Sequence, residues 1–241
     1  MIFRASIPEI RDSLAQPFQV HPITQFGAVR VYVYRSHGEV SRHRHVEFDE
    51  VFLIYEGLVN FWTDREERTL KPDELIWIPR GMAHRSGSRV PSLVILFRKD
   101  FIPEHRNGNF RINGSTMTSP LTVRIHERLR AYSDFTPVLL IKADEVCYYG
   151  LQGSGCSPKW KTQGPAFLLL LRGEIKIEAH QPDWSEPAFG ILTPGEIAVL
   201  PAGTHWQWTS REPSVLFWVE DVERSRLGQN MQNEPFPFLH S

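Results

Sequence analysis

The chain of 241 residues carries 27 basic and 28 acidic side chains, and its formal net charge is −1. A protein without excess positive charge does not attract nucleic acid or anionic lipid strongly, so we expect neither nucleic acid nor a membrane as a partner. The N-terminal segment is interrupted by charged residues and lacks the apolar core of a signal peptide, which predicts a cytoplasmic protein. The 18 prolines and the 41% of hydrophobic residues indicate a globular chain with many turns.

Most of the elements predicted along the chain are strands. A short helix is expected over residues 7–15, where Ser6 can cap the first turn, and another near residues 123–131. Between them, β-branched and aromatic runs recur between turns rich in Gly, Pro and Asp, which is typical of antiparallel sheets. In the first half these predicted strands are residues 28–34, 50–57, 58–62, 74–79 and 92–97. The pattern predicts an all-β fold.

Four side chains with metal-binding groups are spaced so that they can meet. His43 and His45 are two residues apart, so on a strand both imidazoles point to the same side. Glu50 opens the next apolar run and can face inward beside them. The turn that contains Gly81 reverses the chain and brings in His84. The spacing therefore predicts one site formed by His43, His45, Glu50 and His84.

The chemistry of these four groups points to a transition metal. Neutral imidazoles bind divalent transition metals well, a carboxylate offsets part of the charge, and positions remain for water, substrate or dioxygen. Fe or Mn is favoured, and Ni, Co or Zn would also fit. Glu47 is an alternative ligand, because it shares strand parity with His43 and His45. Glu50 is preferred, because Glu47 lies in a polar corner of the sequence.

The second half of the chain repeats the first. Residues 70–81 (LKPDELIWIPRG) match residues 192–203 (LTPGEIAVLPAG) at an offset of 122. Residues 52–57 pair with residues 168–173 at an offset of 116, so the second copy has six extra residues in a loop. Such a repeat predicts two barrels in tandem.

The site residues resemble the two motifs of the cupin superfamily, G(x)5HxH(x)3,4E(x)6G and G(x)5PxG(x)2H(x)3N. The sequence departs from these motifs at His37, Asp73 and Ser88, which stand where the motifs have Gly, Gly and Asn; none of the three is a metal ligand. The matching positions are His43, His45, Glu50, Gly57, Pro79, Gly81 and His84.

The resemblance implies an all-β fold of two tandem double-stranded β-helix barrels, the jelly-roll or cupin barrel, with the metal inside the first. The chain is accordingly divided into an N-terminal metal-binding barrel, residues 1–110, and a C-terminal degenerate barrel, residues 111–241. A polar segment, residues 103–120, is the expected linker or surface lid between them.

The same alignment predicts that the second barrel holds no metal of this kind. Lys159 and Lys161 replace the two histidines, Ala166 replaces the glutamate and Trp206 replaces the last histidine. We therefore expect one metal ion per chain and a structural role for the second barrel. A residual pocket, formed by these lysines with Trp206 and Trp208, could bind an anion or an aromatic ring.

The site predicts a protein that acts on a small oxygen-bearing molecule, and the resemblance favours a dioxygenase-type oxidoreductase. Two alternatives are a non-catalytic small-molecule-binding or regulatory protein and a metal-dependent isomerase or lyase. Arg80 and Arg85, beside the turn that carries His84, are candidates to bind a substrate carboxylate. A homodimer is a further expected assembly.

Overall fold

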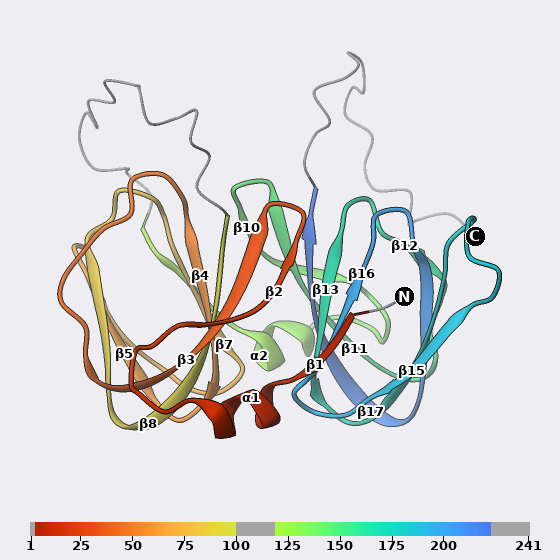
Figure 1. The fold of residues 1–241 in the computed structure, drawn as a ribbon, viewed down its shortest axis with the longest axis horizontal. Helices are drawn as coiled ribbons and strands as arrows, with labels where there is room; N and C mark the ends of the chain where they lie inside the picture. The colour runs from red at the N-terminus through yellow and green to blue at the C-terminus, as the bar shows by residue number, and fades with distance from the viewer. Residues whose placement is uncertain (1–2, 100–118, 223–241) are drawn as a thin grey trace, which may run out of the picture.

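The computed structural model describes residues 3–99 and 119–222, which form two β-barrels side by side (Figure 1). The strands of the first sheet are β2 (His21–Phe26), β3 (Val29–Glu39), β4 (Glu50–Glu56), β5 (Val59–Thr63), β6 (Glu67–Leu70), β7 (Glu74–Ile78), β8 (His84–Lys99) and β9 (Leu121–Arg124). Those of the second are β1 (Phe3–Ser6), β10 (Val138–Ala143), β11 (Val146–Cys156), β12 (Trp160–Lys161), β13 (Ala166–Arg172), β14 (Ile175–His180), β15 (Ala188–Leu192), β16 (Glu196–Leu200) and β17 (His205–Asp221). The helices are α1 (Ile7–Ser13) and α2 (Ile125–Leu129).

Both sheets have the same plan, and the predicted all-β fold of two tandem jelly-roll barrels is confirmed. The first sheet runs β2-β3-β8-β4-β7-β9, and the second runs β1-β16-β13-β17-β11-β10. In each barrel one long strand also pairs outside this path: β8 pairs with β5, and β17 pairs with β12 and β14. These ladders are antiparallel, as expected for strands joined by tight turns.

Strand β8 bends in its middle, so that both of its ends reach the same end of the first barrel. Its first residues pair with β5, and its last residues pair with β4. Glu50 on β4 is the ladder partner of Arg98 near the end of β8, yet its carboxylate lies against His84 at the start of β8. The bend falls near Ser88 and Ser92, where the register with β3 shifts. The bend therefore places residues from both ends of β8 at the same end of the first barrel.

The two halves exchange one strand each. The N-terminal β1 pairs with β16 of the second sheet, and β9 pairs with β7 of the first sheet. In Figure 1, β1 accordingly lies against the second barrel. The predicted domain division has its boundary between residues 110 and 111, outside the described residues, and it stays a prediction. Most of the predicted linker, residues 103–120, also lies outside them.

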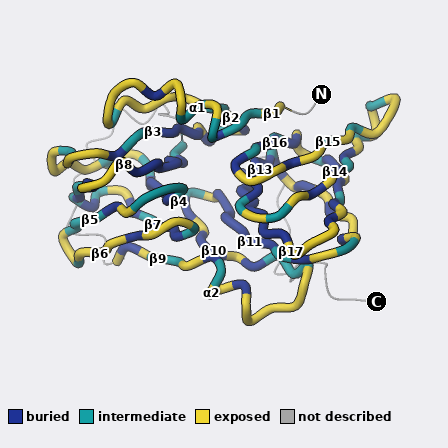
Figure 2. Tube along the Cα trace, turned by 90° about the horizontal axis from the view of Figure 1, so that it is seen from below, coloured by how far each residue is buried: buried dark blue, intermediate teal, exposed yellow. Residues whose placement is uncertain are grey.

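Three apolar clusters stabilise the fold. One fills the interior of the first barrel and includes Phe52 and Phe61, and another fills the interior of the second. The largest contains residues of both halves, among them Phe97 and Phe167, whose ring centroids are 5.3 Å apart. Figure 2 shows that most residues of the facing strands β11 and β13 are buried, whereas β15 on the outer side consists mainly of intermediate and exposed residues. The barrels therefore share one continuous core.

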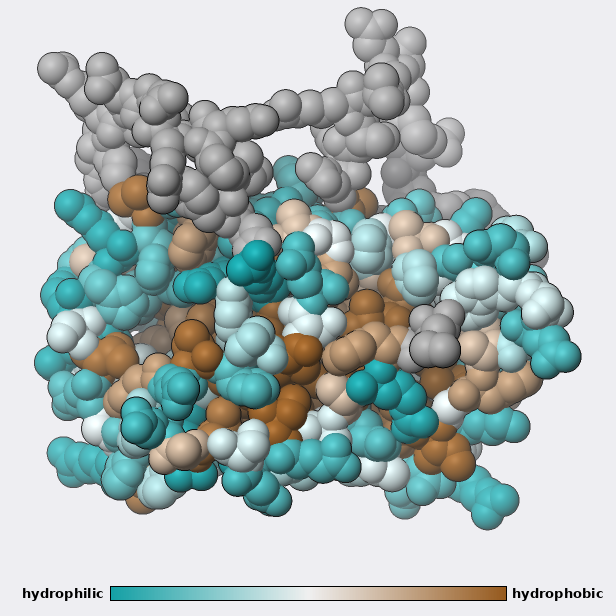
Figure 3. All heavy atoms as spheres, in the orientation of Figure 1, coloured by the Kyte–Doolittle hydropathy of each residue, from teal (hydrophilic) through white to brown (hydrophobic). Residues whose placement is uncertain are grey.

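The surface agrees with this arrangement. In the space-filling view, apolar side chains gather near the middle of one face, around the junction of the barrels, and hydrophilic side chains cover much of the periphery (Figure 3). Within residues 3–99 and 119–222, we find no helix long and apolar enough to span a bilayer.

The predicted helices are shorter than expected. Helix α1 begins after Ser6, whose side chain accepts a hydrogen bond from the Glu9 amide at 3.4 Å, as predicted for its cap. Helix α2 has five residues. The start of the segment predicted as helix, residues 123–124, instead belongs to β9, because pairing with β7 continues the first sheet there.

Candidate metal centre

The backbone brings the histidine segments together through a short bridge. The His43 amide donates to the His84 carbonyl at 2.9 Å, and the His84 amide donates back to His43 at 2.8 Å. His43 and His45 lie on the segment between β3 and β4, and the prediction that they share a regular strand is wrong. A third bond, from the Gly81 amide to the His45 carbonyl, ties the turn before His84 to the same segment. The bridge between His43 and His84 holds the two segments in register.

The four predicted side chains converge in the structure. His43, His45, Glu50 and His84 each offer one ligand atom, and these atoms all lie within 4.8 Å of one another. The Nε2 atoms of His45 and His84 lie 3.5 Å and 3.3 Å from Glu50 Oε2. These separations are longer than strong hydrogen bonds and suit ligands that share one ion.

Backbone carbonyls hold two of the imidazoles in orientation. His43 Nδ1 lies 2.7 Å from the Ser41 carbonyl, and His84 Nδ1 lies 3.2 Å from the Met82 carbonyl. A carbonyl can only accept, so these contacts favour the tautomer with hydrogen on Nδ1 and leave Nε2 as the ligand atom. Carbonyl contacts of this kind are common around metal-binding histidines.

The electrostatic environment fits a bound cation. Glu50 is 3% exposed, and its Oε2 atom is buried without a hydrogen-bond partner. A buried carboxylate oxygen without a partner is costly, and a metal ion at the centre of the group would satisfy it. Burial lowers the pKa of His45, although the charge of Glu50 opposes this, so the neutral form that binds metals is favoured. The alternative ligand, Glu47, is exposed and lies outside the group.

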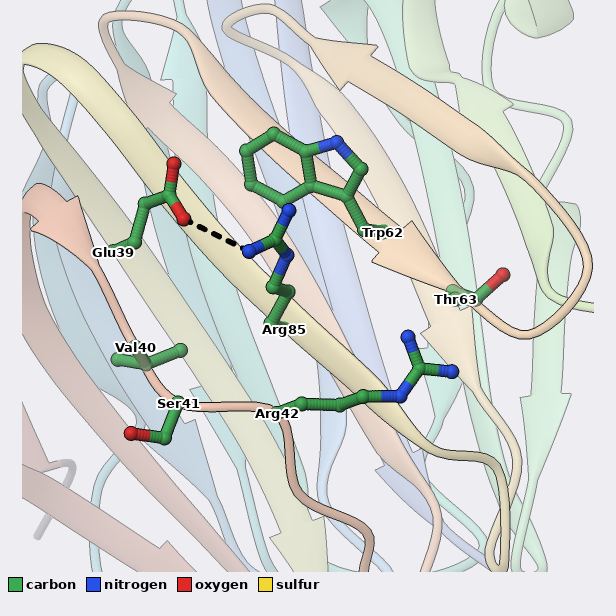
Figure 4. Close-up of a pocket in the computed structure, with 7 residues that line it drawn as sticks. All are labelled: Glu39, Val40, Ser41, Arg42, Trp62, Thr63 and Arg85. Atoms are coloured by element: carbon green, nitrogen blue, oxygen red, sulfur yellow. Dashed lines mark hydrogen bonds and ion pairs between the residues drawn. The ribbon is translucent and has the colours of Figure 1, made fainter.

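The two arginines predicted as substrate anchors lie elsewhere. Arg85 pairs with Glu39 at 3.1 Å, and its guanidinium carbon lies 4.5 Å from the centroid of the Trp62 ring. Figure 4 shows this pair in a cleft on the outer side of the first barrel. Arg80 forms ion pairs with Asp49 and Asp144. Neither guanidinium is left without an acidic partner.

Sequence reasoning missed Arg98. Its guanidinium carbon lies 5.3 Å from the centroid of the Phe48 ring, and that ring stacks on His45. The signal was present in the sequence, because Val94, Leu96 and Arg98 alternate along β8, and the two apolar side chains face the barrel interior. Arg98 is therefore an inward-facing cation beside the predicted metal site.

A polar link connects the second barrel to the segments that carry Glu50 and His84. The Asp49 amide donates to Asp144 Oδ2 at 2.8 Å, and Asp49 Oδ1 accepts from the Arg80 amide at 2.9 Å. Asp49 Oδ2 accepts from the Trp77 indole at 3.0 Å. Asp49 precedes Glu50, Arg80 belongs to the turn before His84, and Asp144 lies in the turn between β10 and β11. Asp144 of the second barrel thus supports both the segment that carries Glu50 and the turn that precedes His84.

Replacing Asp144 with asparagine should weaken metal binding by roughly 10-fold, because supporting contacts around a site commonly tune affinity by 10- to 100-fold. Asparagine can still accept from the Asp49 amide but loses the ion pair with Arg80. Competition with a chromophoric chelator measures the change. Glu145→Gln is the matched control, since Glu145 is the next residue and pairs only with the exposed Lys142 among the described residues. Equal affinities of the two variants would contradict the bracing role.

The second barrel has no equivalent group among the described residues. Ala166 and Trp206 are buried at the positions of Glu50 and His84, while Lys159 and Lys161 are exposed. The predicted residual pocket is found in part: Lys159 and Trp206 line a cleft of about 400 Å³, together with Glu178, His180, Pro187, His205 and Gln207. Trp208 is fully buried in the core of the second barrel.

Comparison with known proteins agrees with this architecture. The first structural relative is a cupin 2 conserved barrel domain protein from Leptotrichia buccalis, with a TM-score of 0.66, 14% identity, and coverage of 91% of this chain and 96% of that one. The oxalate decarboxylase of Bacillus subtilis, a protein with Mn(II) centres, has a TM-score of 0.62 at 11% identity, over 90% of this chain and 76% of that one. The chain is a bicupin by fold.

Two sequence comparisons match shorter parts of the chain. Residues 26–118 match the AraC-like ligand binding domain family. A 55-residue segment is 40% identical to the uncharacterized protein YdbB of Bacillus subtilis (strain 168); it covers 22% of this chain and 48% of that relative. The chain thus spans about half the length of this curated relative. The cupin fold and the convergent His/Glu group together make the first barrel a candidate metal-binding cupin barrel.

Proposed function

We propose that this bicupin is a metal-dependent, dioxygenase-type oxidoreductase that acts on a small oxygen-bearing molecule at the mouth of its first barrel. The observation that carries the proposal is the convergence of three imidazoles on the buried, unpartnered oxygen of Glu50. His43, His45, Glu50 and His84 would hold one divalent metal, with Fe or Mn favoured. The Mn(II) centres of the structurally similar oxalate decarboxylase support that choice.

The metal, when bound, would supply Lewis-acid or redox chemistry, and the protein supplies the surroundings. Phe52 and the other apolar side chains of the barrel interior exclude water from below the site. Tyr34 is fully buried; burial raises the pKa of its phenol, the bond to Ser86 lowers it and the charge of Glu50 raises it again. The Tyr34 hydroxyl therefore stays protonated near Glu50.

A second candidate function is the binding of a small molecule without turnover. The match of residues 26–118 to an AraC-like ligand binding domain favours this alternative. Metal-dependent isomerase or lyase chemistry, in which the ion polarises a carbonyl, uses the same ligands and is the third candidate.

Oxygen consumption separates these candidates. We expect the Fe-loaded protein to consume oxygen with at least one member of a panel of catechols, β-diketones and keto acids, and we expect His45→Ala to consume none. The measurement is oxygen-electrode uptake with product analysis. Turnover without oxygen uptake would favour the isomerase or lyase. If the metal-loaded protein binds members of the panel but converts none, the binding function is the better proposal.

A further inference from the structure

Arg98 lies at the mouth of the first barrel beside the four predicted ligands. It is directly opposite Glu50 in the ladder between β4 and β8. Val94 and Leu96, which have the same parity on β8, belong to the interior cluster of the first barrel. The side chain is therefore directed to the site rather than to the outer surface.

Two aromatic rings hold the guanidinium of Arg98. Its carbon lies 4.7 Å from the ring centroid of Tyr32 and 5.3 Å from that of Phe48. The Phe48 ring stacks in turn on His45, with centroids 4.8 Å apart and planes inclined by 22°. Contact with aromatic faces holds the planar group in place and leaves its N–H donors, which lie in the plane, available to a ligand.

The two arginines beside the turn that carries His84 are neutralised by carboxylates, and Arg98 differs from them. Arg80 pairs with Asp49 and Asp144, and Arg85 pairs with Glu39. Within residues 3–99 and 119–222, the Arg98 guanidinium contacts two aromatic rings and forms no ion pair with a carboxylate. A half-buried cation of this kind is a ready partner for an anion that enters the pocket.

The charges of the pocket also select for an anion. Glu50 is the single carboxylate in the ligand group, so it offsets half of the charge of a divalent ion. Arg98 adds a further positive charge beside the ligand group, between the rings of Tyr32 and Phe48. A neutral substrate would leave the charge of Arg98 uncompensated, whereas a carboxylate would offset the charge of Arg98.

We propose that Arg98 determines the substrate class of the site by binding the carboxylate of a small organic acid. The proposal rests on the proposed function, because the metal ligands define the pocket in which the acid would lie. The packed side chains of Phe52 and Phe61 close the barrel interior below the ligands, so the acid has to be small. A planar guanidinium binds a carboxylate through two parallel hydrogen bonds, which a lysine cannot reproduce.

The test compares carboxylate binding in matched arginine variants. Isothermal titration of the Mn-loaded protein with acetate, pyruvate and benzoate should detect binding of at least one, and Arg98→Gln should weaken it by about 10- to 100-fold. Arg98→Lys should restore part of the loss, because it keeps the charge without the planar fork. Arg89→Gln is the control, since Arg89 is an exposed residue of the same strand. Methyl pyruvate, which lacks the charge, should bind weakly to every form.

Metal content and carboxylate binding are measured on the same samples, so two failures can be told apart. A wild-type chain that takes up no metal contradicts the proposed function. A chain that takes up metal but binds none of the three acids contradicts the role of Arg98. Equal binding by wild type and Arg98→Gln, at equal metal content, also overturns it. Loss of metal in Arg98→Gln would assign Arg98 to support of His45 instead and would overturn the proposal as well.

Discussion

Replacing His45 with alanine is expected to remove most of the bound metal from a chain that otherwise carries close to one ion. Loss of a supporting contact already lowers metal affinity 10- to 100-fold, and loss of a ligand should lower it by more than about 100-fold. The barrel should remain folded, because its interior is filled by apolar side chains such as Phe52 and Phe61 rather than organised by the ion. Elemental analysis of protein purified without chelator, with circular dichroism as the folding check, measures both effects.

Two matched pairs of variants sharpen this test. His205→Ala removes an exposed histidine of the second barrel and should leave the metal content unchanged. Glu50→Gln should lose metal while Glu47→Gln should retain it, because only Glu50 belongs to the convergent group. The reverse result would assign the carboxylate ligand to Glu47. Two ions per wild-type chain would contradict the prediction that the second barrel holds none.

Local spacing was sufficient to predict which side chains of the site meet. The signals are short-range in the sequence. His43 and His45 are two residues apart, Glu50 is the first residue of the next apolar strand, and His84 follows the turn at Gly81. The backbone around them also tolerates the departures from the motifs. Asp73 stands where a glycine is expected, and it adopts the left-handed conformation with a φ of 63° that aspartate accepts more readily than most residues.

Long-range relations were beyond the sequence pattern. Alternation along β8 indicates only that Arg98 faces inward. Its position beside His84 and Glu50 also depends on the bend of β8, and no local signal predicts that curvature. The exchange of β1 and β9 between the sheets likewise depends on packing between halves that are distant in sequence. The sequence of β4 is apolar on both faces, which predicts that both faces are buried. It does not predict that the second barrel covers one of them.

Replacing Phe97 with alanine is expected to lower the free energy of unfolding by about 3–5 kcal/mol, the range for a buried aromatic side chain. Phe97 is fully buried and its ring centroid lies 5.3–5.7 Å from those of Phe167, Tyr148 and Phe217, all of which belong to the second half. Those rings belong to the opposite barrel and cannot close the cavity without moving its strands. Urea unfolding followed by circular dichroism measures the loss. Phe189→Ala, at a side chain that is 58% exposed, should change stability by less than about 0.5 kcal/mol.

The Phe97→Ala variant also tests whether the two barrels unfold together. In a background that carries Trp62→Phe and Trp77→Phe, the remaining tryptophans all lie in the second half, among them Trp206, Trp208 and Trp218 in the core of the second barrel. Their fluorescence then reports on that barrel, although Phe97 belongs to the first. Because the barrels share one core and exchange strands, the fluorescence midpoint should fall as far as the midpoint seen by circular dichroism. A fluorescence midpoint that stays at the wild-type value would mean that the second barrel is stable by itself. In that case Phe97 would stabilise only the barrel that carries the candidate metal site.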